Sequence, residues 1–76
     1  MQNTANTVAD PVQKLTNREF EIFQLIAKGL SSIDIAEKLQ ISKSTVDVNR
    51  KNIRSKLNLK NNSELIHYAY DWTREQ

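Results

Sequence analysis

The stretch that decides the fold is residues 29–59, which read GLSSIDIAEKLQISKSTVDVNRKNIRSKLNL. Its first half predicts a short helix with a buried stripe of Ile35, Ala36 and Leu39. The segment 40–42 then forms a turn, in which Ile41 can fill the core while Ser42 caps the next helix. The second half predicts a longer helix from about residue 43 to 57. Two short helices joined by a tight turn are typical of a helix-turn-helix.

The flanking sequence predicts one further helix on each side. Thr16 is followed three residues later by Glu19, so the two can form a capping box at a helix start. This helix shows an apolar stripe, and Gly29 can end it in a left-handed turn. The stripe is Ile22, Phe23, Ile26 and Leu30. Ser31 or Ser32 caps the next helix, with Asp34 placed for a capping box from Ser31.

The end of the chain predicts a fourth helix from about residue 63 to 74. Asn58 can end the third helix in a left-handed conformation, and Leu59 would then pack back onto the core. Asn61 or Asn62 caps the fourth helix. No strand pattern competes, so the expected fold class is all-α with four helices.

The chain of 76 residues is long enough for one small domain. We expect residues 15–76 to form it and residues 1–14, which have little apolar content, to be a flexible tail or the remnant of a linker. With no cysteine and one histidine, His67, we expect neither a disulfide nor a metal site, and no cofactor. The absence of a long apolar run predicts a cytoplasmic chain without a membrane span or signal peptide.

The positive charge of the chain is concentrated in one segment. Residues 43–60 carry six lysines and arginines and one acid, a net charge of +5, whereas the rest of the chain is −3 and the total +2. A basic run can be only a solvated helix face. Because this run coincides with the second helix of a helix-turn-helix pattern, it favours a site for double-stranded DNA.

A helical wheel divides the third helix into an inward and an outward face. Val46, Ile53 and Leu57 lie within about 40° of one another and define the inward face. The residues near the helix start on the other side are the predicted contacts to base edges: Ser44, Asp47, Val48 and Lys51. Lys51 can donate to guanine, Val48 can pack on a thymine methyl and Asp47 can accept from cytosine.

Two of these residues have ordinary alternatives. Val48 can be a singly exposed apolar residue, and Asp47 can instead pair with Arg50 or Lys51. Phosphate contacts are expected from residues on the flanks of this helix and at the start of the preceding one: Ser31, Ser32, Thr45, Asn49, Arg54, Lys56 and Lys60. For Arg50 we expect the stem to cover the edge of the core while the guanidinium reaches water.

The fourth helix holds three of the five aromatic residues of the chain. Leu65, Ala69 and Trp72 share one stripe, and Ile66 and Tyr70 share another. One stripe can pack on the first helix while the other meets a second copy, or all of this surface can fold onto the monomer. We expect a homodimer on DNA, with an interface drawn from Leu65, Ile66, Ala69, Tyr70 and Trp72.

Four segments and two residue pairs of the chain together resemble the DNA-binding domain of the LuxR/NarL/FixJ/GerE type. They are LTNRE at 15–19, IAKGLS at 26–31, IAEKL at 35–39, ISKSTV at 41–46, and the pairs Asn52-Ile53 and Lys56-Leu57. The resemblance implies a bacterial transcription regulator whose third helix enters the major groove and whose fourth helix forms the dimer contact. It also implies a regulatory domain before this one in many members, although single-domain members exist.

The chain departs from the family pattern at three positions. Asp47 stands where the family often has Lys, and Asn49 where it often has His, so the base preferences of other members do not carry over. Phe20 stands where the family usually has a charged residue, and is either an exposed aromatic or a contact for another domain.

The main alternative is a helix-turn-helix that docks on RNA polymerase or on another regulator. An enzyme is not expected, because the chain has no glycine-rich phosphate loop and no carboxylate pair set in a cleft. We likewise expect no small-molecule ligand in this domain.

Overall fold

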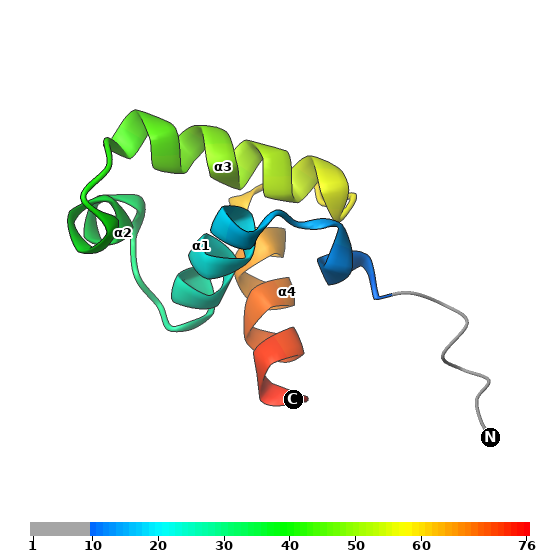
Figure 1. The fold of residues 1–76 in the computed structure, drawn as a ribbon. Helices are drawn as coiled ribbons and strands as arrows, with labels where there is room; N and C mark the ends of the chain where they lie inside the picture. The colour runs from blue at the N-terminus through cyan, green and yellow to red at the C-terminus, as the bar shows by residue number, and fades with distance from the viewer. Residues whose placement is uncertain (1–9) are drawn as a thin grey trace, which may run out of the picture.

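A computed structural model describes residues 10–76 and shows four α-helices and one short 3-10 helix (Figure 1). The elements are η2 (Pro11–Lys14), α1 (Asn17–Ala27), α2 (Ser32–Leu39), α3 (Lys43–Lys56) and α4 (Asn62–Arg74). Within residues 10–76 there is no strand, which confirms the predicted all-α class. No helix in this range is long and apolar enough to cross a membrane.

Side-chain caps begin each of the four α-helices. The cap oxygen accepts the backbone N–H of the third helical residue in every case, Thr16 from Glu19, Ser31 from Asp34, Ser42 from Thr45 and Asn61 from Glu64. The predicted capping boxes of α1 and α2 are both complete, since the Glu19 and Asp34 carboxylates accept the N–H of their cap residues. The structure also selects Ser31 over Ser32 and Asn61 over Asn62 as caps.

The first three α-helices end in the same way. A residue with positive φ follows each one, Gly29 at 93°, Gln40 at 57° and Asn58 at 60°. The next residue is apolar, donates its N–H to a carbonyl five residues back and packs against the core: Leu30, Ile41 and Leu59. Gly29 and Asn58 confirm the prediction. Gln40 was not expected in this conformation, because only glycine and asparagine adopt it readily.

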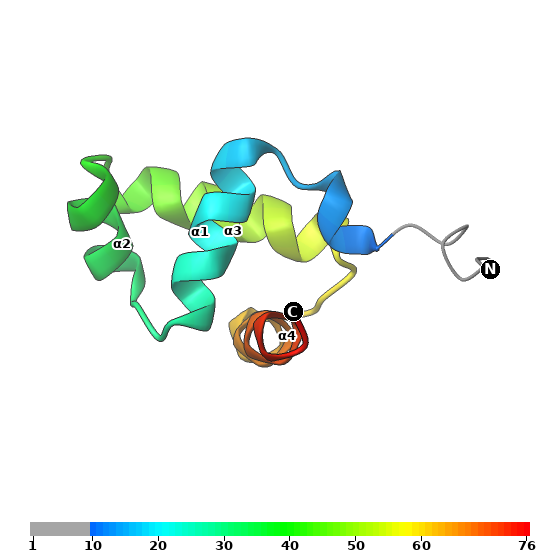
Figure 2. The ribbon, with the colours of Figure 1, turned by 60° about the horizontal axis from the view of Figure 1, so that its bottom comes forward.

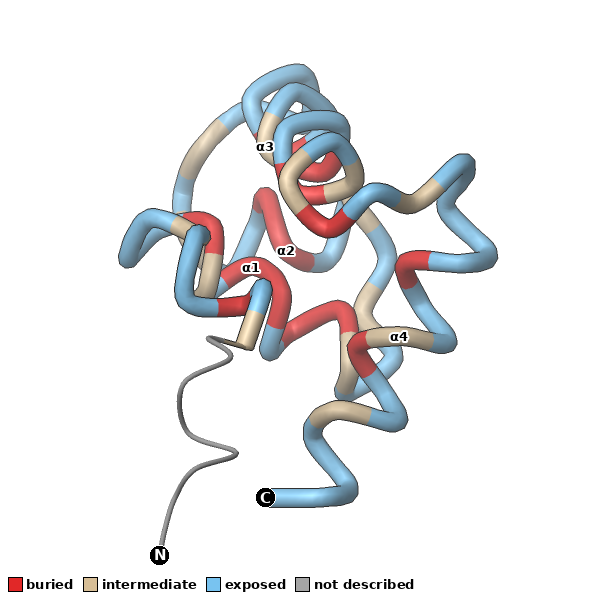
Figure 3. Tube along the Cα trace, turned by 90° about the vertical axis from the view of Figure 1, so that its right-hand side faces the viewer, coloured by how far each residue is buried: buried red, intermediate tan, exposed pale blue. Residues whose placement is uncertain are grey.

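The core lies where α1 packs against the other three helices, as the red segments of Figure 3 show. Ile22 and Phe23 of α1 are fully buried, and Ile26 is nearly so. From α3 the core receives Val46, Ile53 and Leu57, which confirms the predicted inward face. Figure 2 shows α4 end-on beside α1, while α3 runs behind α1. Fixing the inward face of α3 also fixes which of its residues face away from the protein.

The structure corrects the predicted tail for residues 10–14. Pro11–Lys14 is a 3-10 helix capped by Asp10, and Val12 is buried in the core. Asp10 Oδ2 also accepts a hydrogen bond of 2.6 Å from the indole Nε1 of Trp72. Trp72 lies 62 residues further along the chain, so the segment itself gives no sign of this anchor. Residues 1–9, the rest of the predicted tail, lie outside the described residues.

Candidate nucleic-acid interface

One side of α3 is free of the rest of the protein. In Figure 1 this helix runs along the upper edge of the molecule with nothing above it. Ser44, Val48, Lys51 and Ser55 are exposed along that side, and 57% of Val48 is accessible. The major groove of B-DNA, about 12 Å wide, admits an α-helix presented in this way. The outward side of α3 is therefore a candidate DNA-reading surface.

The four predicted base contacts, Ser44, Asp47, Val48 and Lys51, are all exposed on α3. Among residues 10–76 no ion pair engages Lys51, so its ammonium is available to an external acceptor. The aliphatic side chain of Val48 has no polar group to satisfy and could pack on a thymine methyl. The arrangement suits direct contact with base edges.

The ion-pair partner of Asp47 is neither of the two residues that the sequence suggested. The Oδ2 of Asp47 lies 2.7 Å from Nζ of Lys43, one turn earlier in α3, rather than pairing with Arg50 or Lys51. The hydrogen bond from Lys43, and after it one from Ser32 of α2, lowers the pKa of Asp47. Asp47 is therefore a carboxylate paired with a lysine of its own helix.

Most of the predicted phosphate contacts lie beside the outward face, but several are already hydrogen-bonded. The Ser31 hydroxyl and amide belong to the capping box of α2. The Thr45 hydroxyl lies 2.9 Å from that of Ser42, and Asn49 Nδ2 donates to the Thr45 carbonyl. Arg54 Nη1 donates to Asn62 Oδ1 at 2.7 Å. Ser32 is the first residue of α2, and Lys60 lies directly before Asn61, the cap of α4.

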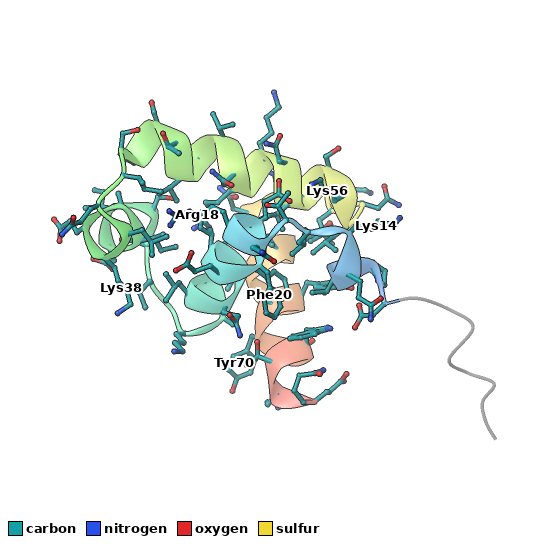
Figure 4. The ribbon with its side chains drawn as sticks, viewed as in Figure 1. Lys14, Arg18, Phe20, Lys38, Lys56 and Tyr70 are labelled. Carbon is teal, nitrogen blue, oxygen red and sulfur yellow. The ribbon has the colours of Figure 1, made fainter. Side chains whose placement is uncertain are left out.

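Lys56 was predicted to contact phosphate, but its side chain points toward α1 instead (Figure 4). Its Nζ lies 2.6 Å from Oε1 of Glu19, whose residue is only 5% exposed. Burial raises the pKa of Glu19, but the hydrogen bond from Lys56 and then one from the Thr16 amide outweigh this effect, so the pKa lies below its usual value. The pair joins α3 to α1. The sequence indicated Glu19 only as the partner of Thr16 in the capping box of α1.

Beside the outward face, a groove of about 720 Å³ lies between the α1–α2 connection, α3 and the start of α4. We call it the basic groove, after four cations among its lining residues, Lys43, Arg50, Lys51 and Arg54. Ser31 and Ser32, Asp47 and Asn62 also line it. The groove follows from the tertiary packing of all four α-helices and was not predicted.

Arg50 is buried deeper than expected. Only 6% of this residue is exposed, and its Nε is buried without a hydrogen-bond partner in the described chain. Burial lowers the pKa of Arg50, although the nearby Asp47 carboxylate acts in the opposite direction. The Nε of the guanidinium is therefore shielded from water, which differs from the prediction that the whole group reaches it.

The structure places three of the five predicted dimer residues inside the monomer. Leu65 and Ala69 are fully buried. Trp72 packs edge-on against the rings of Phe20 and Phe23, with 5.7 Å between centroids in each pair. Phe20 is thus a half-buried aromatic of the core edge, as Figure 4 shows.

The second stripe of α4 remains available to a partner. Ile66 is 46% and Tyr70 53% exposed, and Tyr70 projects away from the core in Figure 4. The Arg74 guanidinium lies over the Tyr70 ring, 5.4 Å from its centroid. These two apolar side chains, one helical turn apart, define what we call the α4 outer stripe.

Residues 10–76 contain no group of three or more histidine, aspartate or glutamate side chains that could hold a metal ion. His67 is exposed on α4.

Comparison with known proteins identifies the family. The GerE family model, described as bacterial regulatory proteins of the luxR family, matches residues 13–69. Among similar proteins are those named oxygen regulatory protein NreC from Staphylococcus aureus strains bovine RF122 / ET3-1, MRSA252 and JH9. Each is 50% identical over 68 residues, which cover 90% of this chain but 31% of the relative. The chain belongs to the LuxR family of bacterial regulatory proteins, and its four α-helices form that family's DNA-binding domain.

Proposed function

We propose that this chain is a sequence-specific transcription regulator that inserts α3 into the major groove of DNA. The observation that supports this proposal best is the outward face of α3, where Ser44, Val48 and Lys51 are exposed opposite a fully buried face. The N-terminal part of a recognition helix is the part that contacts base edges. In this reading Lys51 donates to guanine and Val48 packs on a thymine methyl, while Asp47 accepts from cytosine if it leaves Lys43.

The flanks of α3 supply the phosphate contacts that hold the helix in register. Ser31, Ser32 and Arg54 lie on one side, and Thr45 and Asn49 on the other, with Lys60 beyond the helix end. Lys56 leaves the predicted set, because its ammonium is bound to Glu19. Such contacts give affinity without reading the sequence.

We further propose that two copies bind together on an inverted repeat, through the α4 outer stripe of Ile66 and Tyr70. Two exposed side chains per copy bury far less than the roughly 1,200–2,000 Å² typical of a stable interface. The dimer therefore forms mainly on DNA, where the two α3 helices would enter grooves about 34–36 Å apart. The chain would act in the cytoplasm, and it spans 31% of the length of the relatives that it matches.

Selection from a randomised duplex pool, followed by a salt titration on the enriched site, tests this function. With about four to six phosphates neutralised per domain, log affinity should fall with log salt with a slope of about −0.9 for each. An enriched inverted repeat with this slope is the expected result. Salt-dependent binding without enrichment would refute sequence-specific recognition. Absence of binding at low salt would refute the DNA site and favour docking on RNA polymerase.

A further inference from the structure

The Nε of Arg50 is an unsatisfied hydrogen-bond donor at the basic groove. This nitrogen is buried and donates to nothing in the described chain, although arginine keeps its charge under all ordinary conditions. A buried donor without an acceptor destabilises a fold by about 1–3 kcal/mol. A ligand bound in the groove would satisfy this donor if it supplied a hydrogen-bond acceptor.

The groove around Arg50 is suited to an anion. Lys43, Lys51 and Arg54 line it together with Arg50, and the only acid among its lining residues is Asp47. The carboxylate of Asp47 is already hydrogen-bonded to Lys43. The four cations and one carboxylate leave an excess of three positive charges along this groove.

The start of α2 adds backbone donors at the same place. Ser31 and Ser32 line the groove, and Ser31 is the N-cap of α2. Because the capping box uses the amides of Ser31 and Asp34, the amides of the two residues between them have no intrahelical acceptor. A helix start with free amides favours phosphate groups.

The groove also lies where a DNA strand would pass. Lys51 belongs both to the outward face of α3 and to the lining of the groove. A helix seated in the major groove has a phosphate backbone on each flank, so the strand on the α2 side would run along this rim.

We propose that the basic groove holds one phosphate group of the DNA backbone and that the guanidinium of Arg50 is its anchor. This inference rests on the proposed function and deepens it, since it assigns the buried arginine a contact that fixes the depth of α3 in the major groove. The planar fork of arginine can give a phosphate two parallel hydrogen bonds, with the α2 amides completing the site.

The first test compares Arg50→Met with the wild-type chain on duplex DNA. Methionine keeps an apolar stem and removes the unpaired donor, so the variant should fold, which its thermal unfolding would show. We expect its affinity to fall about tenfold or more on enriched and random DNA alike, and the magnitude of its salt slope to fall by about 0.9. Lys14→Met removes one positive charge from η2, outside the groove, and should change neither quantity.

Duplexes with one uncharged methylphosphonate at a time locate the phosphate. Replacement at one backbone position should weaken binding of the wild-type chain but not of Arg50→Met. If wild-type and Arg50→Met bind DNA with the same affinity and slope, the inference is wrong while the proposed function stands.

The NMR signal of the Arg50 Nε–Hε group in the wild-type chain gives a readout that needs no variant. It should shift on addition of duplex DNA and stay unchanged with millimolar inorganic phosphate. If the chain binds no DNA, the proposed function fails. A saturable shift with inorganic phosphate would then show that the groove takes free phosphate instead of the DNA backbone, and no shift with either probe would overturn the site altogether.

Discussion

Replacing Lys56 with methionine distinguishes between two roles of this lysine, one in stabilising the fold and one in binding DNA. The sequence places Lys56 among the phosphate contacts, whereas the structure joins its Nζ to Glu19 Oε1 at 2.6 Å. If the ion pair is its role, Lys56→Met should destabilise the fold and leave DNA affinity nearly unchanged. If the sequence-based role is right, the two effects should be reversed.

The size of the destabilisation follows from the surroundings of the pair. A hydrogen bond to a charged group contributes about 1.5–3 kcal/mol, and a fully exposed ion pair about 0–1 kcal/mol. The Glu19 side chain is 6% and the Lys56 side chain 35% exposed, so the pair lies between these limits and nearer the first. Glu19 also keeps the Thr16 amide as a partner after the substitution. We therefore expect a loss of about 2 kcal/mol in the free energy of unfolding.

Thermal unfolding measured by circular dichroism is the assay. A change of 1 kcal/mol shifts Tm by about 4–8 °C in a domain of this size, so Lys56→Met should melt about 8–16 °C lower. Its DNA affinity and salt slope, measured below the melting range, should match the wild type within about twofold. Lys60→Met is the matched control, because Lys60 is exposed and within residues 10–76 takes part in no ion pair. It should keep its Tm and bind DNA more weakly. An unchanged Tm for Lys56→Met, together with weaker and less salt-dependent DNA binding, would refute the reasoning.

Three further predictions concern the reading face, the dimer and the pH dependence. Lys51→Ala should lose about 1–3 kcal/mol of discrimination at one base pair, measured on single-base variants of the enriched site; equal losses on all sequences would contradict its role in base reading. Tyr70→Arg should keep the wild-type Tm but weaken binding to an inverted repeat more than to a half-site, and unaltered cooperativity would exclude the α4 outer stripe from the interface. The folded-state pKa of Glu19 lies below its reference value of 4.5, so its contribution to stability is complete above about pH 4.5 and is lost as the pH falls through the lower, folded-state pKa. Urea midpoints between pH 6 and 3 should therefore fall less in Glu19→Gln than in the wild type, and equal decreases would contradict this assignment.

Local signals in the sequence predicted the four helices and several of their ends. Thr16, Ser31 and Ser42 cap helices in the observed structure because a short oxygen-bearing side chain can satisfy a free amide in its own first turn. The inward face of α3 was also predictable, since the 3.6-residue period places Val46, Ile53 and Leu57 on one side of the helix. The inward face fixed which residues point outward, and these form the candidate DNA-reading surface.

The partners of polar side chains were not predictable in the same way. Lys56 and Glu19 are 37 residues apart, and Trp72 and Asp10 are 62 apart, so no sequence period relates them. The wheel gave Lys56 a flank position correctly but could not show that α1 lies against that flank. For α4 the two stripes were recognised, yet only the packing of Trp72 on Phe20 and Phe23 showed which stripe is buried.

The sequence by itself therefore determined the four α-helices, the caps of α1 and α3 and the two faces of α3, because hydrogen bonds within one turn and the period of apolar residues are local properties. Tertiary structure alone decided that Lys56 is an ion-pair partner, that residues 10–14 join the core and that Arg50 is buried in a basic groove. Each of these results depends on which surfaces of separate helices meet. The contacts of a long polar side chain are set by distance in space, which the order of residues along the chain does not specify.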